Sequence, residues 1–314
     1  MKISVLIPAF NAEKYIEETL NSIFNQTYKN FEILIADDCS TDNTKKIINN
    51  INSSNLIKLH NERNLKKPLT VQKLFQNSTG EIITIHDADD ISLPNRFERM
   101  VHQFKQLPHL GMCGHIIERI SEKGKPLGLY RNKISDYKEI KKRMQHDNTD
   151  GDPSMFIRRS VLVELGQIFR PYFNNNMDYD LALRIIEKNE TSNVTEVLSY
   201  YRNVPGSISK GVHSYKKLVT QKMTQFFAME RKEKGSDALM REDWELIRRM
   251  ETEFSQPYLN DPTLHYRQMA SFFMYTRMNF EAIKYMFKAI NKEPFKWNNW
   301  HTLQYCLRKT LIGF

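Results

Sequence analysis

The sequence lacks two features that would each define a protein class: paired cysteines and a long apolar run. Its 314 residues contain three cysteines, Cys39, Cys113 and Cys306. An odd number at these spacings argues against a disulfide framework and a zinc site, and it indicates free thiols in a reducing compartment. No run approaches the roughly 18 apolar residues that a membrane-spanning helix needs. We therefore expect a cytoplasmic protein without a transmembrane segment.

The composition also lacks the signature of a disordered chain. Apolar residues make up 40% of the sequence and charged residues 26%, which suits a globular protein with a real core. The length fits one large domain or a main domain with a smaller one. The first residues, MKISVLIPAFN, hold one lysine and an apolar run broken by Pro8, so they predict a strand rather than a secretory signal.

The net charge of +9 is uneven along the chain. Residues 1–210 hold 29 Lys and Arg against 26 Asp and Glu, whereas residues 211–314 hold 17 against 11. Such an excess is compatible with nucleic acid, an anionic membrane surface or phosphorylated ligands. Because no nucleic-acid-binding module is recognisable, we expect no nucleic-acid partner.

Strand-like apolar runs alternate with helical periodicity over the first ninety residues. The expected strands are 3–8, 31–38, 56–61 and 81–87, and the expected helices between them are 12–26, 40–51 and 68–77. This rhythm predicts an α/β fold with a largely parallel sheet. Asn11 is expected to cap the first helix.

The alternation loosens after residue 90. We expect a helix at 94–106 and a strand at 112–120, then short strands at 153–159 and 196–202 around a helix at 179–188. From about residue 211 the pattern is helical, and residues 263–294 resemble one tetratricopeptide unit. The predicted domains are 1–210 and an α-helical domain, 211–314.

Carboxylates gather where two expected strands end. Asp37 and Asp38 close the second strand, and Asp87, Asp89 and Asp90 follow the fourth. Ligands of open parallel sheets bind beyond such ends, and Mg²⁺ or Mn²⁺ is commonly held by one or two carboxylates with substrate phosphates. The alternatives are solvated turn residues for the first pair and a hydrated loop for the second group.

Taken in order, these segments resemble family 2 glycosyltransferases with the GT-A fold. The resemblance covers about residues 3–210, in the stretches SVLIPAFNAEKYIEETLNSIFNQTYKNFEILIADDCSTDNT, TGEIITIHDADDISLPNRFERM, DPSMFIRRSVLVELG, MDYDLALRI and LSYYRNVPGSIS. It implies a Rossmann-like, mostly parallel sheet flanked by helices, with a C-terminal helical appendage.

The activity implied by the resemblance is inverting transfer of a sugar from a UDP-sugar donor to a hydroxyl of a saccharide or lipid-linked saccharide. The family-level expectation is bacterial surface polysaccharide assembly in the cytoplasm. There the protein could contact the inner face of the cell membrane peripherally.

The resemblance also implies roles for residues near the nucleotide. Asp38 matches the carboxylate that accepts from the pyrimidine ring, and Pro8, Ala9 and Phe10 match the segment against the base. A basic residue, Lys66 or Lys67, falls near the nucleotide.

The family's DxD motif matches Asp87, Ala88 and Asp89. Asp89 is expected to contact Mn²⁺ or Mg²⁺ directly, while Asp87 lies nearer the ribose as a further metal ligand and Ala88 borders the nucleotide. Asp90 is expected to act through water or another residue. Such a metal stabilises negative charge on the departing diphosphate.

Asp178 matches the position of the family's catalytic base, although Met177 stands where the family has Glu. The alternative is that Asp178 caps the helix that follows, in which case its carboxylate has a structural role. Arg202 and Asp152 are further expected contacts to the diphosphate or the acceptor.

Two rival functions remain open. A sugar nucleotidyltransferase usually carries a glycine-rich loop after its first strand, but AFNAEKY has no glycine. A non-catalytic nucleotide-sugar binder is disfavoured because Asp38, the DxD motif and Asp178 occur together.

Aromatic and basic residues interleave between Trp297 and Lys309. They predict either packing onto the helical domain or contact with an anionic membrane.

Overall fold

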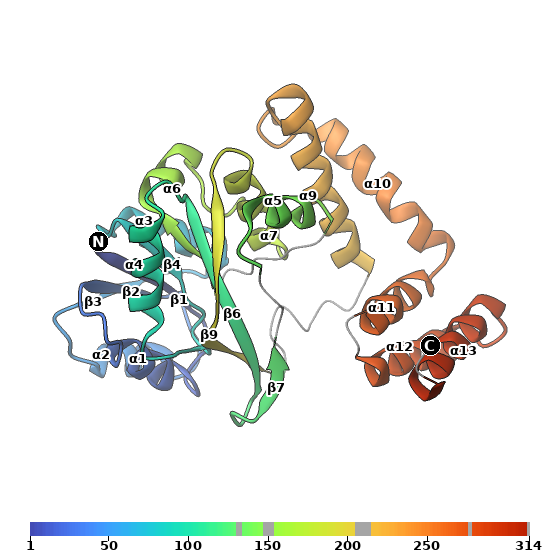
Figure 1. The fold of residues 1–314 in the computed structure, drawn as a ribbon, viewed down its shortest axis with the longest axis horizontal. Helices are drawn as coiled ribbons and strands as arrows, with labels where there is room; N and C mark the ends of the chain where they lie inside the picture. The colour runs from blue at the N-terminus through green and yellow to red at the C-terminus, as the bar shows by residue number, and fades with distance from the viewer. Residues whose placement is uncertain (130–133, 147–153, 205–214, 276–277, 313–314) are drawn as a thin grey trace. The chain divides into compact units, whose positions relative to one another are not determined.

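The computed structural model describes residues 1–129, 134–146, 154–204, 215–275 and 278–312. The chain forms two compact units, Met1–Gly211 and Val212–Phe314, which are coloured along the chain in Figure 1. Each unit is described by itself.

Nine strands of the first unit, among the residues described, form one sheet. The order across it is β3-β2-β1-β4-β8-β6-β9-β5, with β7 paired to β6. The strands are β1 (Ile3–Ala9), β2 (Phe31–Asp37), β3 (Leu56–His60), β4 (Ile82–Ile85), β5 (Ile91–Ser92), β6 (Met112–Ser121), β7 (Pro126–Leu129), β8 (Phe156–Arg158) and β9 (Thr191–Asn203).

Most strands of this sheet share one direction. β1 is parallel to β2 and β4, and β2 is parallel to β3. β8 is antiparallel to both β4 and β6, so β6 runs with β4, and β9 is parallel to β6. Only β5, β7 and β8 among the described strands run the other way. The predicted α/β fold with a mostly parallel sheet is confirmed.

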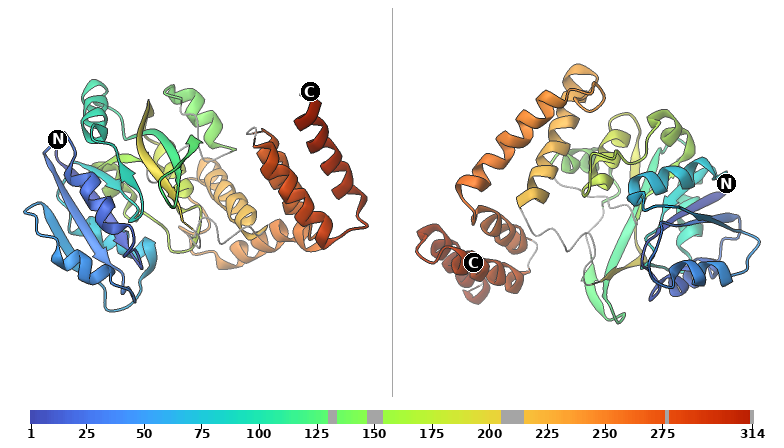
Figure 2. Two further views of the ribbon diagram at one scale, coloured as in Figure 1. Left: turned by 90° about the horizontal axis from the view of Figure 1, so that it is seen from below. Right: turned by 180° about the vertical axis from the view of Figure 1, so that it is seen from behind.

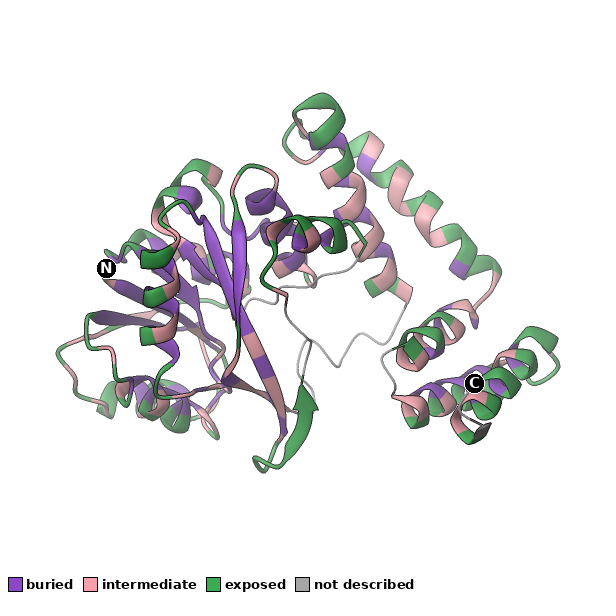
Figure 3. Ribbon diagram, viewed as in Figure 1, coloured by how far each residue is buried: buried purple, intermediate pink, exposed green. Residues whose placement is uncertain are grey.

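The helices of the first unit cover the sheet on both faces. They are α1 (Ile16–Phe24), α2 (Thr44–Asn50), α3 (Lys66–Gln76), α4 (Arg96–Gln106), α5 (Tyr137–Met144), α6 (Arg159–Leu165) and α7 (Met177–Ile186). Figure 3 shows the sheet as the most buried part of the unit, with the β7 hairpin strand exposed.

The alternation of side chains along β1 explains why helices are needed on both sides. Ile3, Val5 and Ile7 belong to a core cluster that includes residues of α1 and α4. Leu6, which points to the other face, is also fully buried, and α3 packs on β1 and β2 there. A strand buried on both faces reads as a continuous apolar run, which is why ISVLIP is recognisable from the sequence.

Some local features differ from the sequence predictions. Asn11 does not cap α1, because the helix begins only at Ile16, and Asn11 has a positive φ of 50°. Its side-chain oxygen instead accepts from the Thr41 amide at 2.9 Å, which ties the loop after β1 to the loop after β2. The two-residue strand β5 was not predicted either; it pairs with β9.

The second unit is helical in its described residues, as its sequence pattern predicts. Its helices are α9 (Tyr215–Lys234), α10 (Trp244–Asn260), α11 (Leu264–Tyr275), α12 (Asn279–Lys292) and α13 (Trp297–Ile312). α12 packs on both α11 and α13, and Figure 2 shows these last helices side by side. No described helix has the length and hydropathy to cross a membrane.

Candidate functional site

The carboxylates singled out from the sequence lie where the carboxyl ends of the parallel strands meet, on either side of the end of β1. The Asp38 amide donates to the Ala9 carbonyl at 2.8 Å, and the His86 amide donates to the Leu6 carbonyl at 2.9 Å. Because β2 and β4 both pair with β1, their ends are two strand spacings apart, about 10 Å. We call Asp38, Asp87 and Asp89 the acidic edge.

Asp38 is buried, and one of its carboxylate oxygens is held in place. Oδ1 accepts from the Asn61 side-chain amide and from the Leu65 backbone amide, both at 2.8 Å. Within the described residues no group donates to Oδ2. The carboxylate is therefore oriented by the protein while one oxygen stays available to an N–H donor of a ligand.

Of the two candidate lysines, only Lys67 makes a contact at the acidic edge. Its Nζ lies 2.6 Å from Asp87 Oδ1. Lys66 is exposed and has a positive φ of 64° at the start of α3. With this backbone conformation at Lys66, the side chains of Lys66 and Lys67 have different surroundings, which the sequence alone could not show.

The surroundings of Asp89 disfavour the ionised form of its carboxylate. Burial raises its pKa to about 6, and the negative charge of Asp87 contributes in the same direction, whereas Lys67 acts against both. Two carboxylates at such a site repel when both are ionised, so the pair favours a cation.

Asp90 and Arg202 are buried behind the acidic edge rather than on its surface. The Arg202 amide donates to Asp90 Oδ1 at 2.9 Å, and its guanidinium donates to the Asp89 carbonyl at 3.0 Å. The same guanidinium bonds the Glu122 carbonyl and the Glu18 carboxylate. Arg202 thus fastens the loop that carries Asp87 and Asp89 to β9 and α1.

Thr19 of α1 adds a second anchor to this loop. Its hydroxyl lies 3.1 Å from the Ala88 carbonyl and 2.9 Å from the Asp90 carbonyl. The sequence did not predict this role of Thr19, because a threonine on the sheet-facing side of a helix has no pattern that marks it as functional.

A series of hydrogen-bonded, buried polar side chains supports the loop that carries Asp87 and Asp89, on the side of β6. Burial lowers the pKa of His86 to about 3, and the charge of Arg96 adds to that effect, so the imidazole is neutral. Its Nδ1 is 2.8 Å from the Asp87 carbonyl and its Nε2 is 3.0 Å from the Ser92 hydroxyl.

Arg96 completes this chain. It donates to Ser92 Oγ at 2.8 Å and to His115 Nε2 at 3.0 Å. Burial lowers its pKa to about 9, while Asp90 counteracts that shift. Ser92, Arg96 and His115 were also missed from the sequence, since their roles depend on which residues meet across β5, α4 and β6.

Asp178 lies half-buried in the first turn of α7. The residue before the helix is Asn176, in the left-handed region at φ 58°, so Asp178 is not the cap. Asp180 is fully buried and accepts from Arg170 and Arg184. The two carboxylates of MDYDLALRI therefore differ in burial: Asp178 is half-buried, and Asp180 is fully buried between two arginines.

The loop before α7 lies next to α3. Gln72 of α3 bonds the Gly166 carbonyl and the Ile168 amide, and Arg184 of α7 bonds the Gln167 carbonyl. These contacts place α7 on the side of the sheet that α3 covers, and the first turn of α3 carries Lys67.

The remaining residues predicted for the site differ in how exposed they are. Pro8 and Ala9 end β1 between the carboxylates, and Phe10 is 49% exposed just beyond them. Ala88 is buried. Asp152 lies outside the described residues.

No three His, Cys, Asp or Glu side chains converge on a metal site anywhere in the described ranges. The donor set at Asp87 and Asp89 nevertheless fits Mg²⁺ or Mn²⁺, because these ions commonly take one or two carboxylates and complete their shell with water and phosphate. Burial and the charge of Asp87 raise the pKa of Asp89 despite the nearby Lys67, so a bound cation would stabilise the ionised form of Asp89.

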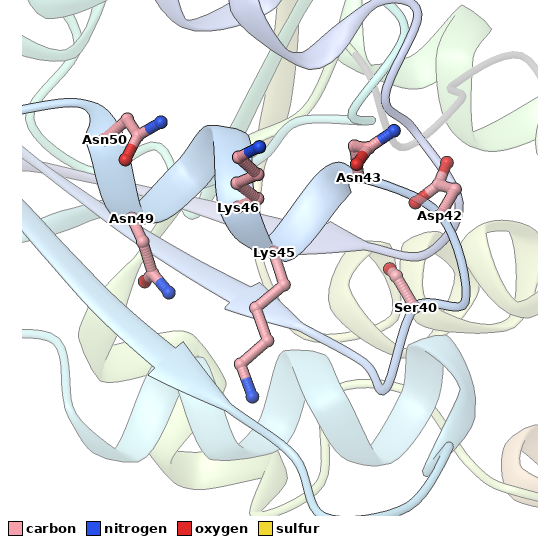
Figure 4. A pocket seen from close by; sticks show the side chains of 7 residues that line it. All are labelled: Ser40, Asp42, Asn43, Lys45, Lys46, Asn49 and Asn50. Carbon is pink, nitrogen blue, oxygen red and sulfur yellow. The ribbon is translucent and has the colours of Figure 1, made fainter.

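An open pocket of 490 Å³ lies beside α2 and contains no member of the acidic edge. Figure 4 shows its polar lining, which consists of Ser40, Asp42, Asn43, Lys45, Lys46, Asn49 and Asn50. We assign no ligand to it.

Comparisons with known proteins bear on the family and the fold of the chain. A family model described as glycosyl transferase family 2 matches residues 4–166. The uncharacterized glycosyltransferase MJ1057 of Methanocaldococcus jannaschii is 28% identical over 207 residues, which cover 65% of this chain and 71% of the relative. The O-antigen biosynthesis glycosyltransferase WbnJ of Escherichia coli is 26% identical over 232 residues, 71% of this chain and 88% of WbnJ.

Among solved structures, S. aureus TarS 1–349 in complex with UDP-GlcNAc is similar to this chain. The TM-score is 0.64 at 18% identity, and the match covers 92% of this chain and 81% of the TarS chain. At this identity the likeness shows a shared fold, and the predicted GT-A architecture is confirmed.

Proposed function

The chain belongs to glycosyl transferase family 2, and on that premise we propose that it transfers a sugar, with inversion, from a UDP-sugar to a hydroxyl group. The acceptor that we propose is a saccharide or a lipid-linked saccharide of a bacterial surface polysaccharide. The name of WbnJ, which refers to O-antigen biosynthesis, and the UDP-GlcNAc in the TarS crystals support this proposal. The observation that carries it is the pair of acidic strand ends on either side of β1.

The nucleoside is proposed to bind at the end of β1. Asp38 would accept from the uracil N–H through Oδ2, since Oδ1 is already held by Asn61 and Leu65. Phe10 offers an exposed ring to the base beside Pro8 and Ala9. The roughly 10 Å between the ends of β2 and β4 suits a ligand that runs from a nucleoside to its diphosphate.

Asp89 and Asp87 would hold Mn²⁺ or Mg²⁺ together with the diphosphate. When bound, such an ion stabilises the negative charge that develops on the leaving diphosphate. Lys67 neutralises Asp87 at 2.6 Å, and we propose that its ammonium turns to a phosphate oxygen when the donor binds. Arg202 and Thr19 would hold the loop so that both carboxylates keep their positions.

Asp178 is proposed as the general base that takes the proton of the attacking acceptor hydroxyl. Its neighbour Asp180 is fully buried between Arg170 and Arg184, whereas Asp178 is half-buried in the first turn of α7, which supports Asp178 as the carboxylate that an acceptor could reach. General-base catalysis of this kind contributes roughly 10²–10⁴-fold to a rate.

A panel of nucleotide sugars tests the donor class without knowledge of the acceptor. The protein would be incubated with UDP-, GDP- and ADP-sugars, with Mn²⁺ or with EDTA, and both thermal stabilisation and slow hydrolysis would be measured. We expect a response to at least one UDP-sugar that depends on Mn²⁺ and is absent with EDTA. Equal responses to all three nucleotide classes, or none to UDP-sugars, would contradict the proposal.

A further inference from the structure

One face of helix α13 packs against α12. Asn299, Leu303 and Cys306 are buried, and Leu303 and Cys306 belong to the core cluster that α12 contributes to. Asn299 also donates to the Ala289 carbonyl of α12 at 3.2 Å. This face recurs at intervals of three and four residues, as expected of a helix that packs along one side.

A second face of α13, about 100° around the helix from the first, is apolar as well, but it is exposed. We call Trp297, Trp300, Leu307 and Leu311 the outer stripe. Their exposed fractions are 76%, 47%, 37% and 81%. With Gln304 in the middle, they follow one another at helical spacings of three and four residues, so they form one continuous row.

The charge around the outer stripe has a single sign. Residues 294–314 contain Lys296, Arg308 and Lys309 and no Asp or Glu. Lys296 pairs with Asp261 and Glu293, but in the described part of the chain no carboxylate pairs with Arg308 or Lys309. At 3.6 residues per turn, Arg308 lies beside the outer stripe and Lys309 lies on the polar side of α13 away from it.

We propose that the outer stripe of α13 docks on an anionic lipid surface, with the helix lying in the plane of the membrane interface. A helix with Trp and Leu on one face and basic residues toward its polar face is suited to the boundary between headgroups and acyl chains. Arg308, beside the stripe, would meet the anionic headgroups, and Lys309 on the polar face would add to the electrostatic attraction. No residue of the acidic edge takes part, so this docking is independent of the transferase chemistry.

The same charges argue against a second copy of the chain as the occupant. A symmetric contact through the outer stripe would bring Arg308 of both copies close together, and the positive charge of both α13 helices would gather at the contact. Because residues 294–314 hold no Asp or Glu, no acidic side chain within that segment would balance these cations. An anionic lipid surface balances them.

Vesicle flotation of the full chain tests the proposal. The protein would be mixed with vesicles of phosphatidylcholine alone or of phosphatidylcholine with phosphatidylglycerol, and the bound fraction measured. Trp297→Ser with Leu311→Ser removes apolar contacts, and Arg308→Gln with Lys309→Gln removes charge. The matched controls lie on α10: Trp244→Ser, an exposed Trp between Asp243 and Glu245, and Arg248→Gln with Arg249→Gln.

We expect binding only to the vesicles that contain phosphatidylglycerol, and weaker binding at high salt. The charge variant should lose about fivefold per removed cation, and the apolar variant at least about tenfold, whereas both α10 controls bind like the wild type. Wild-type protein that does not bind the anionic vesicles, or α13 variants that bind them as tightly as the wild type, would overturn the proposal. Sedimentation that shows a dimer abolished by the α13 variants would overturn it in favour of self-association.

Discussion

The carboxylates of the acidic edge are one residue type in different surroundings. Asp38 has one oxygen held by two donors, Asp87 faces the ammonium of Lys67, and Asp89 is half-buried beside the charge of Asp87. These differences allow neighbouring aspartates to take separate tasks, a hydrogen-bond acceptor for a base and ligands for a metal.

The raised pKa of Asp89 predicts a pH-dependent stability of the metal-free protein. The pKa is 3.8 in an ordinary environment and about 6 in the fold, so between these values the folded state binds a proton that the unfolded chain has released. The stabilisation is present at low pH and is lost as pH rises through about 6. Asp89→Asn should therefore exceed the wild type in stability by about 2 kcal/mol at pH 7.5, and this difference should shrink at pH 5.

Urea unfolding with EDTA at the two pH values measures this effect, with Glu17→Gln, an exposed acid on α1, as the control. A difference between Asp89→Asn and the wild type that is the same at both pH values would show that Asp89 is not the strained carboxylate.

Asp178 and Asp180 should respond differently to the same substitution. Asp178→Asn is expected to lower transfer by at least about 10²-fold while Mn²⁺-dependent UDP binding stays unchanged. Asp180→Asn removes the carboxylate shared by the buried Arg170 and Arg184 and should cost about 3–5 kcal/mol of stability. Melting curves and a transfer assay on both variants distinguish the roles; full transfer by Asp178→Asn would end its assignment as base.

Sequence patterns located the carboxylates but not their supports. The DxD stretch and Asp38 are visible because acids directly follow apolar runs. Lys67 could not be separated from Lys66 without the positive φ at Lys66. Arg202 was expected at the diphosphate, whereas its guanidinium is occupied by Glu18, Glu122 and the Asp89 carbonyl, contacts between segments far apart in sequence.

At the scale of elements, Glu32 of β2 links β1, β2 and β4 near their amino ends, at the end of these strands away from the acidic edge. It accepts from Lys2 and Ser4 at the start of β1 and from Thr79 before β4. Burial alone would raise its pKa, but these hydrogen bonds outweigh burial and lower the pKa from 4.5 to about 2. The ionised carboxylate is therefore part of what sets the register of β1, β2 and β4.

Glu32→Gln is expected to lower the free energy of unfolding by about 1.5–3 kcal/mol at pH 7. Because the folded pKa lies below the unfolded one, the contribution of Glu32 is present above pH 4.5 and is lost as pH falls toward about 2. Denaturant melts at pH 7 and pH 3 measure both effects. An equal loss at the two pH values would mean that the ionised form has no special role.

Elements were predictable where burial imposes a strong pattern. Strands β1, β2 and β4 are apolar on both faces, so their runs were recognised, although the expected fourth strand ends earlier, at Ile85. The two residues of β5 carry too little pattern, and that strand exists because it pairs with Tyr200 and Ser199 of β9. The start of α1 depends on a contact between loops, Asn11 with Thr41, which periodicity does not encode.

At the scale of the whole molecule, we propose that the two compact units are separate domains with separate tasks. All residues assigned to donor binding lie in Met1–Gly211, and the outer stripe lies in Val212–Phe314. A fragment that ends at Gly211 should therefore fold and bind UDP with Mn²⁺ as tightly as the full chain, but it should not float with anionic vesicles. Circular dichroism and calorimetry on the fragment check this, and an unfolded fragment would show that the units depend on each other.

The central claim is that the acidic edge grips the diphosphate of a nucleotide through a divalent ion. Calorimetric titration of UDP into the wild type and Asp89→Asn, each with Mn²⁺ and with EDTA, tests it most directly. The account predicts binding by the wild type that weakens at least about tenfold with EDTA, and binding by Asp89→Asn that is weak and unaffected by Mn²⁺. Equal UDP affinity in all four titrations would contradict it.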